Sequence, residues 1–328
     1  MFNSILNSTF RMLAFSTTFL LMVVFTTSCG NGGGSSLVNI WAWISGSNTI
    51  EQSGSYRTKG ITDSHNIPGA RHSSTSWNDA AGNQWLFGGT GYDSTGTLGS
   101  LNDLWRWDGT NWTWISGSNT VNQSGNYGTI GDPLGTNIPG ARHSSISWND
   151  AAGNQWLFGG TGYDSTGTIG SLNDLWRWDG TNWTWISGSK IVDQPGIYGT
   201  KGTADNANIP GARHQAISWI DTNGYLWLFS GTGYDSTGTT GSLNDLWRWN
   251  GTNWTWMSGS DTVNQSGTYG IKGFADSANI PGARHQAISW TESNGNLLLF
   301  GGTGYDSTGT TGSLNDLWRF KLLLESAP

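Results

Sequence analysis

The sequence contains a unit of 71 residues that recurs four times without any change of register. An arginine followed by a histidine marks each copy, at Arg71-His72, Arg142-His143, Arg213-His214 and Arg284-His285. A phenylalanine before two small residues marks each copy again, at Phe87, Phe158, Phe229 and Phe300. A fixed period of this length indicates one supersecondary module per copy, so that the chain is a solenoid, a propeller or an array.

The composition favours short strands joined by tight turns. Of 328 residues, 50 are glycine and 22 are tryptophan, and only 11% are charged. Such a chain is poor in helix formers and rich in strand and turn formers. The net charge of -7 is spread through every copy. A nucleic-acid-binding protein would instead carry a basic patch or stripe, so we expect no nucleic-acid partner.

The N-terminus has the pattern of an export signal. Arg11 precedes an apolar run over residues 12–25, which Ser16, Thr17 and Thr18 interrupt. This run is shorter and more polar than a membrane span of about 20 residues, and it is typical of a signal-peptide core. We therefore expect residues 1–29 to be a signal peptide and the mature protein to be exported.

The end of this segment resembles the lipobox of bacterial lipoproteins, in which a cysteine is lipidated and becomes the mature N-terminus. Residues 26–30 read Thr-Thr-Ser-Cys-Gly, and Cys29 is the only cysteine of the chain. Thr26 departs from the motif, which prefers leucine there, and an ordinary signal peptide is the alternative. The resemblance implies lipidation of Cys29 and anchoring in the bacterial cell envelope, at the outer membrane or the cell surface. Residues 30–39 are then a flexible, glycine-rich tether.

Each copy predicts four antiparallel strands. In the first copy these are residues 71–77 (A), 84–89 (B), 101–107 (C) and 112–117 (D). The Asp-Gly of residues 108–109 between two tryptophan-rich runs indicates a hairpin turn between strands C and D. Four such strands form one twisted sheet, as in the blade of a β-propeller. The tryptophans all belong to the repeat, and we expect most of them to be core.

The copies resemble the kelch repeat. The resemblance rests on Pro-Gly-Ala-Arg-His at residues 68–72, Leu-Phe-Gly-Gly at 86–89 and Leu-Asn-Asp-Leu-Trp at 101–105, followed by Trp112 and Trp114. It covers residues 40–320 and implies an all-β fold, a β-propeller with one four-stranded blade per copy, usually serving as a binding platform. Residues 321–328 form a short tail beyond it.

The phase of the repeat predicts how the propeller closes. The repeat region starts with a D-like strand at residues 41–46 and stops after a C strand at residues 314–320. We expect the N-terminal strand to complete the last blade, giving a monomeric four-bladed ring without open sheet edges. The alternative is an open arc that assembles with other chains.

Strand order predicts where a ligand binds. The B–C loop, residues 90–100, and the D–A loop, residues 118–140, are long and lie on one face, and long loops in compact folds are often functional. Strand A starts on that face, and in kelch proteins that bind peptides arginines near the start of this strand contact the ligand. The candidate ligand contacts are Arg71, Arg142, Arg213 and Arg284, with Tyr92, Tyr163, Tyr234 and Tyr305, and Tyr56, Tyr127, Tyr198 and Tyr269. Because every copy carries the arginine, it can equally serve to hold the blades together.

Metal and catalytic sites are disfavoured. The four histidines lack neighbouring carboxylates, and the repeated Tyr-Asp-Ser-Thr-Gly of residues 92–96 lacks the acidic density of a calcium loop, so that a turn held by Asp93 is the better interpretation. Near-identical copies also supply one group four times, whereas catalysis needs different groups in defined roles. We expect a non-enzymatic module without metal or cofactor that binds a protein or a glycan. The alternatives are a carbohydrate-active enzyme with its site at the channel mouth and an assembly scaffold.

Overall fold

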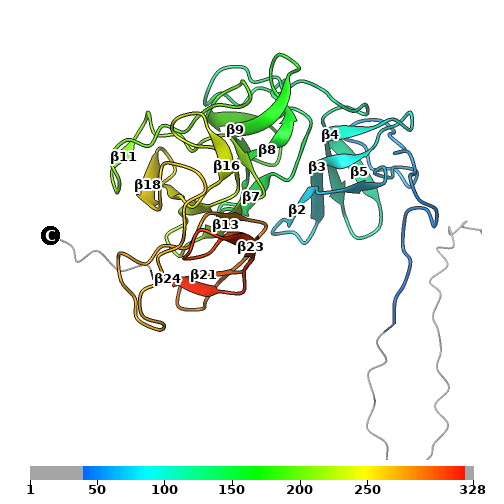
Figure 1. The fold of residues 1–328 in the computed structure, drawn as a ribbon. Helices are drawn as coiled ribbons and strands as arrows, with labels where there is room; N and C mark the ends of the chain where they lie inside the picture. The colour runs from blue at the N-terminus through cyan, green and yellow to red at the C-terminus, as the bar shows by residue number, and fades with distance from the viewer. Residues whose placement is uncertain (1–39, 322–328) are drawn as a thin grey trace, which may run out of the picture. The chain divides into compact units, whose positions relative to one another are not determined.

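The computed structural model describes residues 40–321 (Figure 1). The predicted signal peptide, Cys29, the tether and all but the first residue of the tail lie outside this range. The chain divides into two units, Met1–Ile44 and Ser45–Pro328, and the described residues of the first contain no strand. All regular elements of residues 40–321 are strands paired antiparallel, which confirms the all-β prediction. No helix in this range is long and apolar enough to cross a bilayer.

Each copy of the repeat folds into the same set of strands, and we number the repeats 1 to 4 in chain order. Repeat 1 contains β1 (Arg71–His72), β2 (Thr75–Asn78), β3 (Gln84–Tyr92), β4 (Leu98–Trp107) and β5 (Trp112–Ser116). Repeat 2 contains β6 (Arg142–His143), β7 (Ile146–Asn149), β8 (Gln155–Tyr163), β9 (Ile169–Trp178) and β10 (Trp183–Ser187). In both, the order across the sheet follows the chain, as the hairpin signals predict.

The last two repeats differ in how their strands are divided. Repeat 3 contains β12 (Arg213–His214), β13 (Ile217–Ile220), β14 (Leu226–Phe229), β15 (Thr232–Tyr234), β16 (Thr240–Ser242), β17 (Leu246–Trp249) and β18 (Trp254–Ser258), and β11 (Ala204–Asp205) pairs with β18. Repeat 4 contains β19 (Arg284–His285), β20 (Ile288–Thr291), β21 (Leu297–Phe300), β22 (Thr303–Tyr305), β23 (Thr311–Ser313) and β24 (Leu317–Phe320). Within residues 40–321, repeat 4 has no strand equivalent to β5.

The predicted strand A is broken in the middle. β1 and β2 both pair with β3, but Ser73 between them has a left-handed φ of 55°, and β3 bulges between Phe87 and Gly89. A side chain at Gly89 would place its Cβ 2.7 Å from the carbonyl oxygen of His72. Glycine is therefore required where the two strands approach.

The prediction of a long loop between strands B and C is wrong. β3 continues to Tyr92 and β4 begins at Leu98, with Thr90 opposite Ser100, which leaves a turn of residues 93–97. This hairpin could not be predicted from the sequence because Gly91 pairs with Gly99, and residues without side chains give no pattern of alternating hydrophobicity. The D–A segments do lack long strands, apart from isolated pairings such as Asn126 with Ile138.

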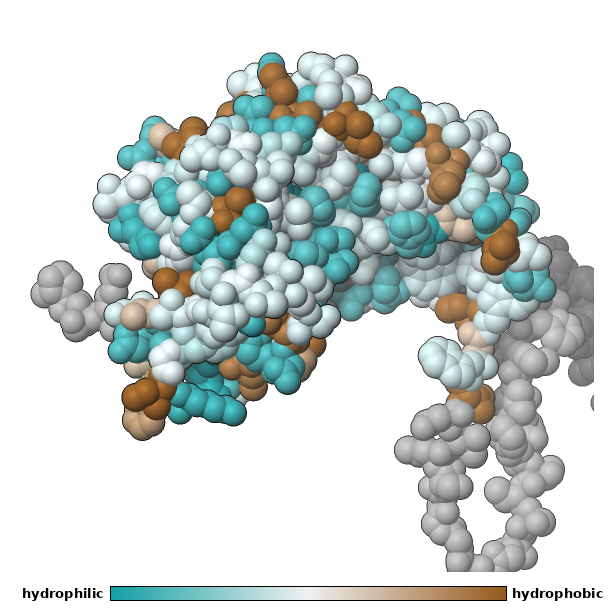
Figure 2. Space-filling model, viewed as in Figure 1, coloured by the Kyte–Doolittle hydropathy of each residue, from teal (hydrophilic) through white to brown (hydrophobic). Residues whose placement is uncertain are grey.

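Successive repeats pack through tryptophan and phenylalanine. The ring centres of Trp85 in repeat 1 and Trp178 in repeat 2 lie 6.1 Å apart, and those of Phe87 and Trp183 lie 5.3 Å apart. The same contacts recur between repeats 2 and 3, where Phe158 meets Trp254. Most tryptophans are therefore core, because each aromatic ring buries a large apolar area between two sheets. In Figure 2 the visible surface is largely polar, with apolar residues scattered in small groups.

The described residues form no closed sheet, so the ring of four blades stays a prediction. The D-like strand predicted at residues 41–46 is absent, Trp41 is 102% and Trp43 68% exposed, and β24 pairs with β21 alone among the described strands. One face of repeat 4 is also exposed, although the other repeats bury the equivalent face. On it Ile288 is 51% and Trp290 48% exposed. β5 is joined to β4 by a tight turn, whereas almost the whole chain separates residues 41–46 from β24.

Candidate functional site

The four candidate arginines lie in the core of their own repeats. Arg142 donates from Nη1 to Asp174 Oδ1 over 2.6 Å and from Nη2 to Oδ2 over 2.7 Å, with both side chains fully buried. Its remaining donors reach the backbone carbonyls of Gly140 and Gly159. The equivalent pairs are Arg71 with Asp103, Arg213 with Asp245, and Arg284 with Asp316. The guanidinium groups thus tie strand A to strand C within each repeat.

The tyrosines of the D–A segments join the same cluster. The Tyr127 hydroxyl donates to Asp174 Oδ2 over 2.7 Å, and Trp176 Nε1 donates to the same oxygen. Burial, followed by the nearby Asp174, raises the pKa of Tyr127 well above its usual value. The equivalent hydroxyl donors are Tyr56 to Asp103, Tyr198 to Asp245 and Tyr269 to Asp316. The D–A segment is therefore anchored to the centre of the repeat that follows it.

The aspartate of this cluster was missed in the sequence. Asp103, Asp174, Asp245 and Asp316 each follow their arginine by 32 residues in an identical Asn-Asp-Leu-Trp context. Burial by itself raises the pKa of Asp316, but hydrogen bonds from Arg284, Trp318 and Tyr269 lower it to about 2. A carboxylate that accepts so many donors stays ionised, and the constant spacing between arginine and aspartate was the signal.

The second set of candidate tyrosines is half-buried at the ends of the B strands. Each is the last residue of its strand: Tyr92 of β3, Tyr163 of β8, Tyr234 of β15 and Tyr305 of β22. Burial, then the neighbouring Asp193 and its hydrogen bond, raise the pKa of Tyr234. These rings thus remain partly accessible on the face that carries the D–A segments.

The turn after each of these tyrosines is held by its aspartate. Asp93 Oδ1 accepts the backbone N–H groups of Thr95 and Thr97, and its Oδ2 accepts that of Val121. The interpretation of Asp93 as a turn residue is confirmed, and its oxygens are engaged by the protein itself.

The histidines form a series from repeat to repeat. His143 Nδ1 lies 3.4 Å from Ser100 Oγ of the preceding repeat, and His214 lies at the same distance from Ser171. Burial lowers the pKa of His143, and His72 lowers it further. In the part of the chain that the structure describes, no three His, Cys, Asp or Glu residues gather closely enough to hold a metal ion.

A small cavity of about 270 Å³ lies where the broken A strands meet. Ser144 donates its backbone N–H to Ser73 O, Gln215 to Ser144 O and Gln286 to Gln215 O, and all four residues have φ of 54–55°. The lining is uncharged and consists of Ser73, Ser74, Ser144, Ser145, Gln215, Ala216 and Gln286. Left-handed residues other than glycine are strained, and the hydrogen-bonded ladder holds them.

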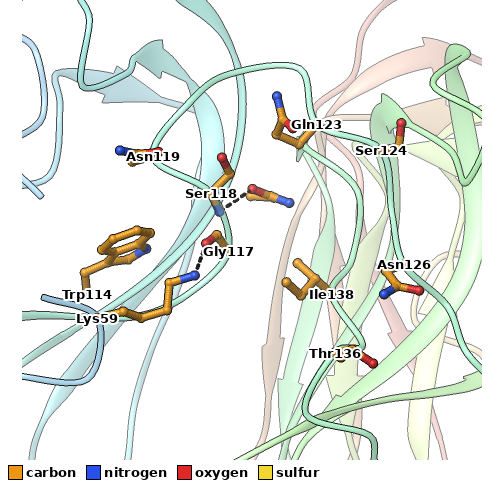
Figure 3. A pocket seen from close by; sticks show the side chains of 11 residues that line it. Lys59, Trp114, Gly117, Ser118, Asn119, Gln123, Ser124, Asn126, Thr136 and Ile138 are labelled. Carbon is orange, nitrogen blue, oxygen red and sulfur yellow. Dashed lines mark hydrogen bonds between the residues drawn. The ribbon is translucent and has the colours of Figure 1, made fainter.

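A larger groove of about 330 Å³ lies between repeat 1 and the D–A segment that leads to repeat 2. Lys59 and Trp114 form one side, and Asn126, Thr136 and Ile138 form the other (Figure 3). The Lys59 amine lies 4.4 Å from the centre of the Trp114 ring and donates to Gly117 O. Asn102, Gly117, Ser118, Asn119, Gln123 and Ser124 complete the lining.

Comparison with known proteins gives no family. No protein-family profile matches the sequence, and no curated protein matches it. Solved structures that match include YjhT, at 14% identity over 77% of this chain and 82% of that one with a TM-score of 0.36. A fungal alcohol oxidase in complex with copper matches at 13% identity over 76% of this chain and 54% of that one, with a TM-score of 0.34. An endo-arabinase from Bacteroides thetaiotaomicron matches at 10% identity over 79% and 78%, with a TM-score of 0.38.

Proposed function

We propose that the protein is a non-enzymatic binding module of the bacterial cell envelope, a kelch-like propeller that captures its ligand on the face carrying the D–A segments. One observation carries the proposal. Side chains that are identical in every repeat are hydrogen-bonded to one another inside the fold, whereas polar side chains that differ between repeats line the groove beside Lys59 and Trp114 without such bonds. Arg142, Asp174 and Tyr127 satisfy one another. The side chains of Asn119, Asn126 and Thr136 make no hydrogen bond to the described residues.

We also infer that four repeats close into one ring through residues 41–46. The ladder of left-handed residues supports this, because its two ends, Ser73 and Gln286, line the same small cavity. The bare face of repeat 4 supports it as well, since the equivalent residues Ile217 and Trp219 are buried in repeat 3. The ring is a monomer, and a lipid on Cys29 would hold it at the membrane.

The test is an array of bacterial envelope proteins and glycans probed with the purified mature protein. We expect capture of a ligand, loss of that capture in the N119A/N126A/T136A triple variant, and no loss in T181A. Thr181 is a suitable control because it is exposed in a C–D turn and its side chain makes no hydrogen bond to the described residues. Silence across the array would reject a binding module, and turnover of a captured glycan would favour the enzyme alternative.

A further inference from the structure

The groove between repeat 1 and the following D–A segment has a chemistry that selects among ligands. Its side chains without a hydrogen bond to the described residues include the carboxamides of Asn119 and Asn126 and the hydroxyls of Ser124 and Thr136. Each carboxamide offers a donor and an acceptor side by side, which matches the paired roles of adjacent sugar hydroxyls. No carboxylate lines the groove. Lys59 is the one charged side chain of the lining, so the groove has no acidic group that would favour a cationic ligand.

The bridged backbone of Asn126 and Ile138 offers a peptide no free strand edge. Asn126 already exchanges both backbone hydrogen bonds with Ile138, over 2.8 Å and 2.9 Å. Recognition by strand addition needs a sheet edge with unpaired N–H and C=O groups. The lysine is not an anion site by itself either, because its amine donates to Gly117 O over 2.7 Å and lies over Trp114.

Trp114 supplies the apolar part of the groove. Its ring is half-buried, and its Nε1 is already engaged by Ser116 O. The Lys59 amine lies over the ring and Tyr56 packs against it with ring centres 5.1 Å apart, so a ligand meets only the hydrocarbon surface that these two side chains leave uncovered. An apolar surface beside a few convergent polar groups is the common make-up of a small-molecule site.

The other repeats provide natural variants of the same groove. In the groove after repeat 2, the residues 71 positions further along replace Lys59 with Ile130, Asn119 with Lys190, Asn126 with Ile197 and Thr136 with Ala207. In the groove after repeat 3, the equivalents are Lys201, Asp261, Thr268 and Ala278. The shared frame is kept, since Gly131 and Gly202 donate to Trp185 O and Trp256 O as Gly60 does to Trp114 O. The neutral carboxamide pair occurs in the first groove alone of these three.

We propose that the groove of Lys59, Trp114, Asn119, Asn126 and Thr136 is a binding site for a neutral oligosaccharide, with Asn126 and Asn119 reading its hydroxyl groups. This rests on the proposed binding function and names its ligand class and its site. The grooves after repeats 2 and 3 have the same backbone and different polar groups, so they do not take this ligand.

The experiment measures binding of neutral hexasaccharides of glucose, galactose, mannose, xylose and arabinose to the mature protein by titration calorimetry. We expect one of them to bind with a stoichiometry of one. N126I and T136A, which install the residues present at positions 197 and 207, should each weaken that binding about tenfold. T181A should leave it unchanged. Because the same fold carries Ile197 and Ala207 at equivalent positions, both variants are expected to fold, and their melting temperatures check this.

A gain-of-function variant separates a binding role from a structural one. I130K/K190N/I197N/A207T rebuilds the polar groups in the groove after repeat 2, and it should raise the stoichiometry from one to two. Absence of binding by all five hexasaccharides would overturn the saccharide assignment. The saccharide assignment would also be overturned if the N126I variant captured an array ligand as well as the wild-type protein does. The protein would then still be a binding module. Capture of no ligand of any class would instead reject the proposed function.

Discussion

Arg142 and Asp174 face each other in a two-point ion pair with no exposed surface on either side chain. The pair joins β6 to β9, and the backbone carbonyls of Gly140 and Gly159 accept further hydrogen bonds from the guanidinium group. Removing one partner from such a pair leaves an uncompensated buried charge, which typically costs about 3–5 kcal/mol. Replacing both partners by apolar groups costs less.

The first prediction follows from this pair. D174N should lower the free energy of unfolding by about 3 kcal/mol or more, and the R142M/D174L double variant should lose less than the sum of R142M and D174L. Denaturant titration measures both. The control is D132N, because Asp132 is exposed and its side chain makes no hydrogen bond to the described residues. Additive losses would show that the ion pair is not coupled.

The second prediction concerns the tyrosine in the same cluster. Y198F removes the donor to Asp245 Oδ2, and a hydrogen bond to a charged group contributes about 1.5–3 kcal/mol. Burial, then Asp245, raises the pKa of Tyr198 far above its usual value, so its ring should not ionise while the protein is folded. Absorbance at 295 nm, followed up to pH 12, should show the buried tyrosines ionising only together with unfolding. Early ionisation of all nine tyrosines would contradict this.

The third prediction concerns pH. Burial lowers the pKa of His143 and His214, and neighbouring histidines lower both further. The unfolded chain, with a histidine pKa of about 6.5, then binds protons more readily than the folded one. The stability that neutral histidines allow is therefore complete above about pH 6.5 and is lost as pH falls below that value. The melting temperature should fall as the pH is lowered from 7.5 to 5, and it should fall less in the H143Q/H214Q variant.

The fourth prediction concerns the turn after the B strand. Asp164 Oδ1 accepts the N–H groups of Thr166 and Thr168 and the hydroxyl of Thr166. D164A should therefore destabilise the protein by about 1–3 kcal/mol, because these donors lose their partner. Since the oxygens serve the turn, calcium at millimolar concentration should not raise the melting temperature of the wild-type protein. A calcium-dependent rise that D164A abolishes would show a metal site instead.

Local sequence signals were sufficient where side chains alternate or a turn residue is required. The C–D hairpin was predicted from Asp108 and Gly109 and is formed between β4 and β5. The B–C hairpin was not, because its central pair, Gly91 and Gly99, carries no side chain. The ion pair could not be predicted locally for another reason: Asp103 follows Asn102 in a Leu-Asn-Asp-Leu-Trp sequence, and nothing local distinguishes a buried carboxylate from a turn residue. The candidate arginines were thus located correctly on strand A, but their environment depended on packing.

The fifth prediction decides between the described state and the proposed ring. Trp41 is the equivalent of Trp112 and Trp183, and Trp183 is buried against Trp178 and Phe87. If residues 41–46 complete repeat 4 in solution, W41A should lower the free energy of unfolding by about 3–5 kcal/mol, as expected for a buried tryptophan. Fluorescence of the wild-type protein should then be blue-shifted relative to a variant lacking residues 40–46.

The state of association completes this test. A ring closed within one chain sediments as a monomer at every concentration and keeps its dependence on Trp41. A chain that closes with a second copy should instead dimerise in a way that W41A abolishes, since the bare face of repeat 4, with Ile288 and Trp290, would then be covered by the partner. A stable monomer indifferent to W41A would show that the edge at β24 stays open. The exposed ring of Trp41 would then be available for contacts outside the chain.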